Sequence, residues 1–336
     1  AASMLATAPA PPARVVPGAW NASILVGTHH KTGTVVLAKV FRVAARIIGV
    51  PRHKGNRSAC AALFAARAPG VCIEEHVSAA SLRAWLTPRT PFIHAVRDPL
   101  EMCVSAYQYH LHATEPWVLA PLRDLGGKSL QQHYRALPAA EGVRFECRRA
   151  RRRRPRRATL LRRAAAAAAR RRMVWEVLEA ALTYNATRWR PNVLTLRFEE
   201  IPRGFDGAMG RLFDFLDSGP QRPRLLKAAA QFDLARNAPG DAAHVSSDGE
   251  KAPLRAHLAA DALLAPLLRS ARALLGYADD GAERAPPPRQ RPSAELLCAQ
   301  AKALCRTTDV RFFQWCTAGR VRRGQIPSMP ECRDDG

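Results

Sequence analysis

The sequence predicts an α/β protein in which helices flank a central parallel sheet. Four short apolar runs have the composition of strands that are buried on both faces. Stretches with the apolar spacing of helices separate these runs, and such alternation is typical of a parallel sheet with covered faces. Apolar residues make up 47% of the 336-residue chain, which is enough to fill the core of this fold.

The first predicted strand and helix enclose a short polar turn, residues 27–34. Ile24–Val26 is apolar throughout and predicts a buried strand. Apolar residues then recur every three or four positions over Val35–Ile48, with basic residues on the opposite face, which predicts a helix packed on the sheet. A strand, a turn of small residues and a helix in this order direct unpaired backbone N–H groups toward an anion.

The rest of the chain continues the alternation. Further strands are expected at Val71–Ile73, Phe92–Val96 and Val193–Phe198. Helices are expected over Leu82–Leu86, after Pro99, and over Met173–Trp189, Met209–Leu216 and Leu254–Leu275, the last broken at Pro266. Arg52–Gly70 is interpreted as a loop followed by an alanine-rich helix, and Pro116–Pro138 as weakly patterned loops that are candidates for substrate binding.

Three polar side chains stand just past the ends of predicted strands. They are Lys31, His76 and Arg97. Ligands of open parallel sheets bind in the crevice at the carboxyl ends of the strands. We therefore expect these three side chains to converge on one site.

We divide the chain into three parts. Residues 1–22 are rich in alanine and proline and predict a flexible lead-in or stem. Residues 23–280 hold the α/β domain, interrupted by an Arg/Ala-rich insertion over 148–172, and residues 281–336 form a Pro/Arg-rich linker and a cysteine-containing tail. No apolar stretch has the length of a membrane span, and because the chain starts with alanine we expect a possible membrane anchor upstream of residue 1.

The net charge of +24 suggests a polyanionic partner, and the thirteen arginines of the insertion carry about half of it. A domain that holds a polyanionic nucleotide is often basic. Nucleic-acid binding is the other interpretation of a high pI. No aromatic residues interleave the arginines of the insertion, so we expect no specific nucleic-acid partner.

Cysteines and glycosylation sequons together favour the lumen of the secretory pathway. Four of the eight cysteines cluster near the C-terminus, at Cys298, Cys305, Cys316 and Cys332. Their spacing does not fit paired zinc ligands, and it predicts two disulfides in an oxidising compartment. Three N-glycosylation sequons begin at Asn21, Asn56 and Asn185.

The turn of residues 31–34 reads Lys-Thr-Gly-Thr, and it fails the Walker A pattern because its lysine precedes the glycine. It resembles instead the 5′-phosphosulfate loop of sulfotransferases, which use 3′-phosphoadenosine 5′-phosphosulfate (PAPS) as donor. Arg97 and Ser105, eight residues apart, resemble the family's 3′-phosphate motif. The resemblance implies a P-loop-like sulfotransferase fold, PAPS as co-substrate, and no metal. It does not cover the Arg-rich run or the cysteine-bearing C-terminal extension.

Further similarities lie in the C-terminal half. Phe198 precedes an acidic pair, as an aromatic residue does in a segment of the family, which places it near the nucleotide. Gly240-Asp241 resembles the end of the family's R-K-G-x-x-G-D loop, although the R-K-G positions read Ala235, Arg236 and Asn237 here. Arg236 and Lys251 are therefore candidates to complete the 3′-phosphate site. The similarity is good from residue 24 to about 217 and weak over 232–277.

The resemblance implies roles for individual residues. The residues expected to bind the donor are Lys31, Thr32, Gly33, Thr34, Val35, Arg97, Ser105, Phe198, Arg236 and Lys251. Val35 replaces a threonine that often follows the family's motif. Lys31 is the expected electrophilic partner of the bridging oxygen, and His76 the expected base, as in the family's K-T-H segment. That segment reads Glu74-Glu75-His76 here, and carbohydrate-modifying members use a glutamate, so Glu75 or Glu74 is a rival base.

The expected activity is sulfuryl transfer from PAPS to a hydroxyl or amine, with a carbohydrate or small molecule as acceptor. The expected location is the Golgi lumen, as a type II membrane protein, with the cytoplasm as the alternative. Two other classes stay open. One is a P-loop nucleotide kinase or hydrolase, although the sequence has neither the Gly-Lys-Ser/Thr order nor a clear Mg²⁺-binding aspartate after a strand. The other is a non-enzymatic basic protein that binds polyanions through residues 148–172.

Overall fold

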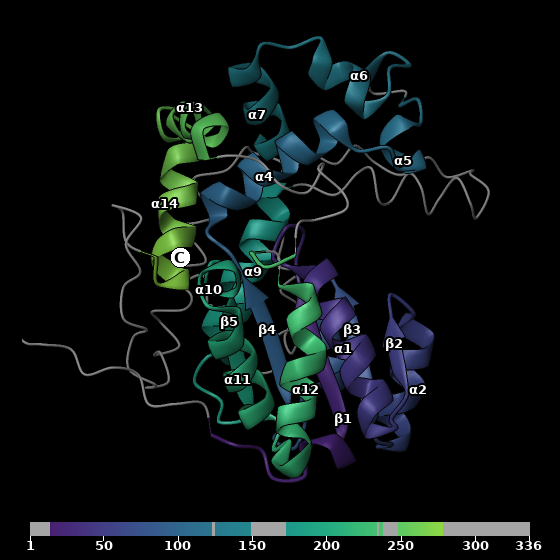
Figure 1. The fold of residues 1–336 in the computed structure, drawn as a ribbon. Helices are drawn as coiled ribbons and strands as arrows, with labels where there is room; N and C mark the ends of the chain where they lie inside the picture. The colour runs from purple at the N-terminus through teal and green to yellow at the C-terminus, as the bar shows by residue number, and fades with distance from the viewer. Residues whose placement is uncertain (1–13, 123–124, 149–172, 234, 238–247, 278–336) are drawn as a thin grey trace, which may run out of the picture.

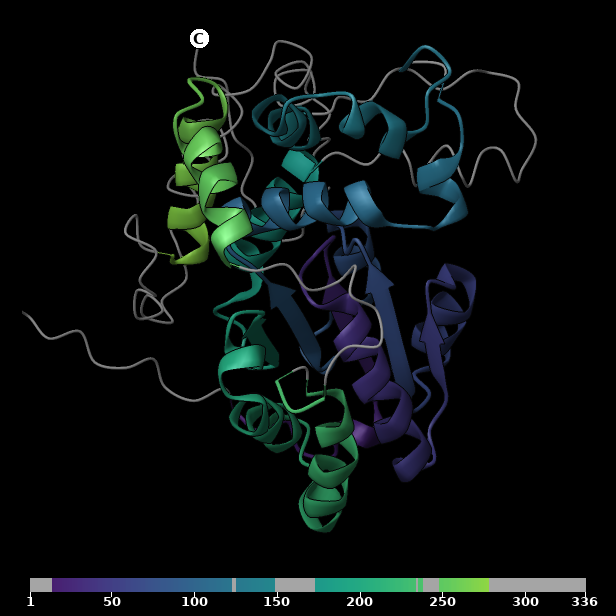
Figure 2. The same ribbon diagram turned by 45° about the horizontal axis from the view of Figure 1, so that its top comes forward.

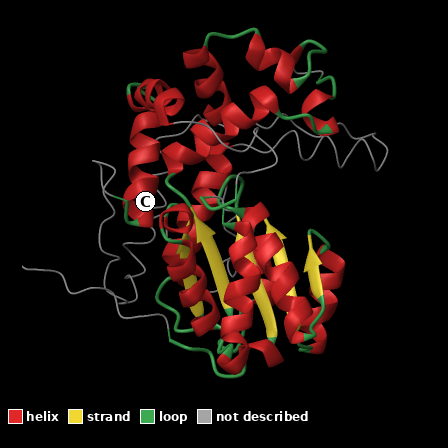
Figure 3. Cartoon of the chain, viewed as in Figure 1, coloured by secondary structure: helices red, strands yellow, loops and turns green. Residues whose placement is uncertain are grey.

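The computed structural model describes residues 14–122, 125–148, 173–233, 235–237 and 248–277. Five parallel strands form one sheet in the order β2-β3-β1-β4-β5 (Figures 1 and 3). The strands are β1 (Ser23–Thr28), β2 (Arg52–Lys54), β3 (Gly70–Glu75), β4 (Phe92–Val96) and β5 (Val193–Arg197). The chain builds β2 and β3 on one side of β1 and then crosses to β4 on the other. The carboxyl end of β1 is therefore the point where the strand order switches, which is where such sheets bind ligands.

Helices cover both faces of the sheet, so β1 is buried along its whole length. On one face, Ile24 and Val26 pack with α1 (Thr34–Ile48), α11 (Phe205–Phe215) and α12 (Arg222–Ala229). On the other face, Leu25 packs with α2 (Arg57–Ala66) and α3 (Ala79–Trp85). This alternation follows from the pleat, which turns successive side chains of a strand to opposite faces.

A layer of helices lies beyond the carboxyl ends of the strands (Figures 1 and 2). Its members are α4 (Pro99–His112), α6 (Leu130–Arg135), α7 (Ala139–Arg148), α9 (Met173–Thr187), α13 (Asp248–Ala259) and α14 (Leu264–Leu275). They share one apolar cluster, in which Met102 and Tyr134 are fully buried. The short helices are α5 (Pro116–Leu119) and α10 (Glu200–Arg203), with 3₁₀ turns at η1 (Ala19–Asn21), η3 (Gly219–Gln221) and η4 (Ala230–Phe232). The carboxyl ends of the strands, which carry the candidate site, thus face this layer.

The four predicted strands are confirmed, as are the parallel sheet and the helix after the first strand. The interpretation of Arg52–Gly70 as loop and helix was wrong at its start, because Arg52–Lys54 forms β2 and pairs with β3. This strand is polar and lies at the edge of the sheet, where one side of the ladder is unpaired and apolar composition is not required. The alanine-rich helix that follows is α2.

Two helical predictions need correction. Pro116–Pro138, expected to be loops, contains α5 and α6, and α6 begins with a capping box formed by Ser129 and Gln132. The helix expected over Leu254–Leu275 is divided at residues 260–263 rather than at Pro266. Pro266 lies in the first turn of α14, where a missing backbone N–H costs nothing because it would have no partner within the helix.

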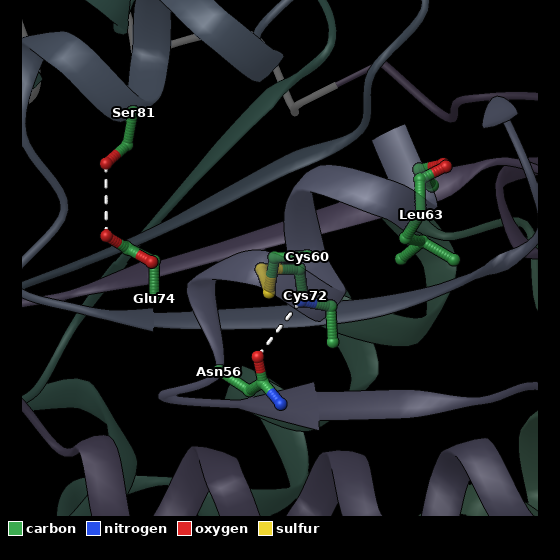
Figure 4. The surroundings of a disulfide bond; sticks show 8 residues. Asn56, Cys60, Leu63, Cys72, Glu74 and Ser81 are labelled. Atoms are coloured by element: carbon green, nitrogen blue, oxygen red, sulfur yellow. Dashed lines mark hydrogen bonds between the residues drawn. A yellow bond between two sulfur atoms is a disulfide. The ribbon is translucent and has the colours of Figure 1, made fainter. Parts of the chain in front are cut away.

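Two disulfides stabilise the described part of the chain, and neither was predicted. Cys60 in α2 is bonded to Cys72 in β3 (Figure 4), and Cys103 in α4 is bonded to Cys147 in α7. The four tail cysteines lie outside the described residues, as do most of the insertion 148–172 and all of residues 281–336. Disulfides persist in oxidising compartments, so these two indicate a secreted or lumenal domain.

The sequons differ in their accessibility. Asn21 and Asn56 are exposed, whereas Asn185 in α9 is only 1% exposed. A glycan needs a surface position, so the sequon at Asn185 is excluded in the folded protein. Among the described helices, none has both the length and the apolarity needed to cross a bilayer.

Replacing both Cys103 and Cys147 by serine is expected to lower the free energy of unfolding by about 4 kcal/mol, because the bond closes a separation of 44 residues in the unfolded chain. The double replacement of Cys60 and Cys72, separated by 12 residues, should cost less, about 3 kcal/mol. Denaturant unfolding followed by circular dichroism measures both. Unchanged midpoints in the two variants would contradict the disulfide assignment.

Candidate active site

The loop after β1 presents the N-terminus of α1 at the switch point of the sheet. Lys31 and Gly33 both adopt left-handed backbone conformations, with φ of 66° and 92°. Gly33 precedes the first turn of α1, and no side chain caps this end of the helix. The first N–H groups of α1 can therefore bind an anion from outside the loop, and the helix dipole favours its negative charge.

The two threonines of the loop have different roles. Thr32 is fully buried, and its hydroxyl donates to the carbonyl of His29 and accepts from the N–H of His29, both at 2.9 Å. The Thr34 hydroxyl donates to that of Thr28 at 2.9 Å and keeps some exposure. Thr32 thus shapes the loop, whereas Thr34 is placed to meet a ligand. Val35, also at the start of α1, is 49% exposed and contributes an apolar surface there.

Arg97 connects the end of β4 to this loop. Its Nη1 donates to the carbonyl of Lys31 at 3.0 Å, and its guanidinium lies 4.5 Å from the centre of the Phe198 ring. The Phe198 ring in turn packs against Gly33 so closely that a β-carbon at position 33 would lie 2.8 Å from it. The Nε of Arg97 is buried and has no hydrogen-bond partner. A buried, unpartnered guanidinium N–H is costly, and an anionic ligand would satisfy it.

Ser105 lies in α4, one turn after Glu101. Glu101, one turn earlier on the same helix, has a carboxylate oxygen 3.7 Å from Nη2 of Arg97. Residues four apart lie on one helix face, so Ser105 follows Glu101 on that face. Arg97 and Ser105 are thereby placed on the same side of α4, with Glu101 as a carboxylate neighbour that sequence reasoning did not identify.

Lys31 has an unusual environment. Its ammonium nitrogen lies 3.1 Å from the centre of the Tyr109 ring, although the residue as a whole keeps some exposed surface. Burial lowers the pKa of Lys31 to about 7, and the positive charge of Arg97 adds to this effect. An anion bound beside both cations would restore the charged form of the lysine.

His76 lies immediately after β3 and faces the same edge. Its backbone is left-handed, with φ of 68°, and its side chain is 24% exposed. The Nδ1 atom lies 2.6 Å from Oε1 of Glu176 in α9. The ring stacks on His30, with 6.4 Å between the centroids. Burial lowers the pKa of His30 to about 3, and the neighbouring charge of Lys31 contributes, so His30 is neutral near pH 7.

The rival bases point elsewhere. Glu75 pairs with Lys54 of β2 at 2.9 Å, and its side chain is 37% exposed. Glu74 is buried and accepts a hydrogen bond from the Ser81 hydroxyl at 3.1 Å (Figure 4). The pleat turns these two consecutive residues to opposite faces of β3. Each carboxylate is therefore engaged with a partner away from the loop.

The remaining two predicted residues are not part of the observed cluster. Arg236 is half-exposed and pairs with Asp206, with Nη1 3.1 Å from the carboxylate, and with Asp233 at 3.1 Å. Lys251 lies in α13, which packs on α7 and α4. The structure thus brings together Lys31, Gly33, Arg97 and Phe198 by direct contact, and His76 through its neighbour His30.

Glu176 was not identified from the sequence. It follows the low-complexity insertion in a helical stretch, and no motif distinguishes it from a surface glutamate. Its side chain is 3% exposed, and it contacts His76, His29 and the backbone N–H of His30. His29 in turn has its Nε2 3.0 Å from Nε2 of the fully buried His94. No group of these side chains within the described ranges has the arrangement of a metal site.

Neither models of protein families nor curated proteins match the chain. The assignment of function therefore rests on the residues themselves.

Lys31 predicts a distinctive dependence of stability on pH. Below about pH 7 the lysine is charged in both the folded and unfolded states, and the cost of burying the charge is present in full. As the pH rises from 7 toward 10, the folded protein loses this proton while the unfolded chain keeps it, so the free energy of unfolding rises. Replacing Lys31 with methionine should remove this rise. Urea unfolding of both proteins between pH 6 and 10 tests this, and parallel curves would contradict the low pKa.

Proposed function

We propose that the protein is a PAPS-dependent sulfotransferase that transfers a sulfuryl group to a hydroxyl or amine of a carbohydrate or small molecule. The observation that carries the proposal is the contact of Arg97 with both the Lys31 carbonyl and the Phe198 ring, beside the uncapped start of α1. Two cationic groups and a row of backbone N–H groups meet there. Such a site fits a ligand with two separate anionic groups.

The proposed donor binds with its 5′-phosphosulfate on the N–H groups at the start of α1, beside Lys31 and the Thr34 hydroxyl. Its 3′-phosphate occupies the position between Arg97 and Ser105, where the unpartnered Nε of Arg97 supports an anion. Phe198 offers an aromatic surface next to both. Arg236 and Lys251 remain candidates for further phosphate contacts.

The proposed reaction is an in-line displacement at sulfur. The acceptor oxygen or nitrogen forms a bond to sulfur while the bond from sulfur to the bridging oxygen of the 5′-phosphate breaks. The acceptor's proton passes to the free nitrogen of His76. Lys31 offsets the negative charge that develops on the bridging oxygen, and it does so most effectively in its protonated form, which the bound donor favours.

The proposed location is the lumen of the Golgi, where PAPS-dependent modification of secreted carbohydrate fits a disulfide-bonded domain. A nucleotide kinase or hydrolase is the alternative, because a parallel sheet with this strand order also holds nucleoside triphosphates. The position of Lys31 before Gly33 rather than after it favours the sulfotransferase.

Arg97→Ala is expected to weaken the binding of PAPS and of adenosine 3′,5′-bisphosphate by a factor that corresponds to about 1.5 to 3 kcal/mol. The affinity for adenosine 5′-phosphosulfate, which lacks the 3′-phosphate, should change little. Calorimetric titration measures all three. Arg222→Ala is the control. This exposed arginine at the start of α12 pairs with Asp214 of α11, and its loss should leave the three affinities unchanged. Equal losses for all three nucleotides would remove the 3′-phosphate assignment.

Lys31→Ala is expected to reduce turnover far more than donor affinity, because its charge matters most in the transition state. His76→Ala should lose the general base, which typically contributes ~10² to 10⁴ in rate, while donor binding survives. A screen of acceptors with labelled PAPS supplies the assay. Glu75→Gln and Glu74→Gln are the comparison variants. If either abolishes transfer while His76→Ala stays active, the base is a carboxylate.

A further inference from the structure

We propose that Glu176 is the positioning residue of His76: its buried carboxylate lies against Nδ1 of the imidazole and favours the protonated ring, which leaves Nε2 to accept the proton of the acceptor. The role of His76 as base rests on the proposed function. The pairing of the two side chains does not, and it can be measured without any substrate.

The geometry of the pair supports this role. Oε1 of Glu176 lies 2.6 Å from Nδ1 of His76, as a charge contact that lacks the alignment of a hydrogen bond. The glutamate side chain is 3% exposed, whereas the histidine side chain is 24% exposed. The carboxylate is thus withdrawn from water and needs N–H partners within the protein. The imidazole thus lies between the buried carboxylate and the solvent.

The second carboxylate oxygen holds the donor loop. Oε2 of Glu176 accepts from the backbone N–H of His30 at 3.3 Å and lies 3.7 Å from Nδ1 of His29. Lys31 follows directly in this loop. One buried carboxylate therefore contacts both the loop that carries Lys31 and the side chain of His76.

The backbone of His76 is constrained independently. Its N–H and that of Val77 both donate to the carbonyl of Thr28, at 2.8 and 3.1 Å. Its left-handed φ of 68° is unfavourable for a residue with a β-carbon, and such conformations persist where the surroundings enforce them. The end of β1 fixes the backbone and Glu176 fixes the ring, so Nε2 has a defined direction.

The charge beside His76 comes from Glu176. Among the described residues, the titratable groups that contact the imidazole are this carboxylate from α9 and His30 from the loop after β1. His30 is neutral near pH 7, because burial lowers its pKa to about 3. A carboxylate at this distance favours the protonated imidazole, and a neutral amide in its place should lower the pKa of His76.

Glu176→Gln tests the proposal, because the amide keeps the shape of the side chain and removes its charge. Imidazole ¹⁵N signals, with His76 identified by its loss in His76→Gln, report the pKa and the tautomer of His76. We expect the pKa of His76 to fall, because the neighbouring negative charge is lost. In the transfer assay, kcat should fall by about tenfold or more with little change in donor KM, and the acidic limb of the pH profile should move down.

Glu146→Gln is the matched control. Glu146 is equally buried, and it contacts another histidine, with Oε2 2.8 Å from Nδ1 of His110. This variant should leave the His76 signals and the pH profile unchanged. If it alters them as Glu176→Gln does, the effect reflects general disturbance of the helical layer and the proposal fails.

A double variant separates positioning from a purely structural role. If Glu176 acts through His76, then Glu176→Gln in a His76→Gln background causes no further loss of kcat. A further loss of similar size, or an unchanged His76 pKa in Glu176→Gln, overturns the proposal. If the wild type transfers no sulfuryl group to any acceptor but the His76 pKa falls in Glu176→Gln, the pairing is supported and the proposed function is wrong.

Discussion

The hydrogen bond from Arg97 to the carbonyl of Lys31 is the interaction on which the candidate site depends. It joins the end of β4 to the loop after β1, two segments that the parallel sheet brings to one edge. The loop needs such a restraint, because Lys31 adopts a left-handed backbone conformation that a side chain disfavours. The same guanidinium packs on Phe198, which fills the space left by the absent side chain of Gly33. Loop, strand end and aromatic ring thus define one another's positions.

The helical layer beyond the sheet completes the site from the other side. Helix α4 presents Tyr109 to the Lys31 ammonium and Glu101 to Arg97, and α9 presents Glu176 to the histidines. Burial, together with the positive charge of Arg97, keeps Lys31 close to the point of losing its proton. An anion bound beside Lys31 and Arg97 would therefore stabilise the folded protein. The disulfide between α4 and α7 stabilises the layer that carries these side chains.

The strands could be predicted because burial on both faces requires apolar runs, and the positions of Lys31, His76 and Arg97 followed from the rule that parallel strands end at one edge. β2 could not, because a polar edge strand has no apolar pattern. Glu176 and His76 are 100 residues apart in the sequence, and Cys103 and Cys147 are 44 residues apart. Both contacts therefore depend on tertiary packing that no local pattern encodes. The carboxylates at positions 74 and 75, the rival bases, contact Ser81 and Lys54, and this could not be predicted because the contacts depend on how the pleat and the neighbouring elements place them.

We propose that the carboxyl end of β1 and the loop after it bind a nucleotide with anionic groups at both the 3′ and 5′ positions. Calorimetric titration of the wild-type protein with adenosine 3′,5′-bisphosphate, adenosine 5′-monophosphate and ATP tests it most directly, since the first two differ only in the 3′-phosphate. We expect the bisphosphate to bind at least about tenfold more tightly than either of the others, as is typical of one charge-assisted contact. Equal affinity for adenosine 3′,5′-bisphosphate and adenosine 5′-monophosphate, or tighter binding of ATP, would contradict the proposed nucleotide site.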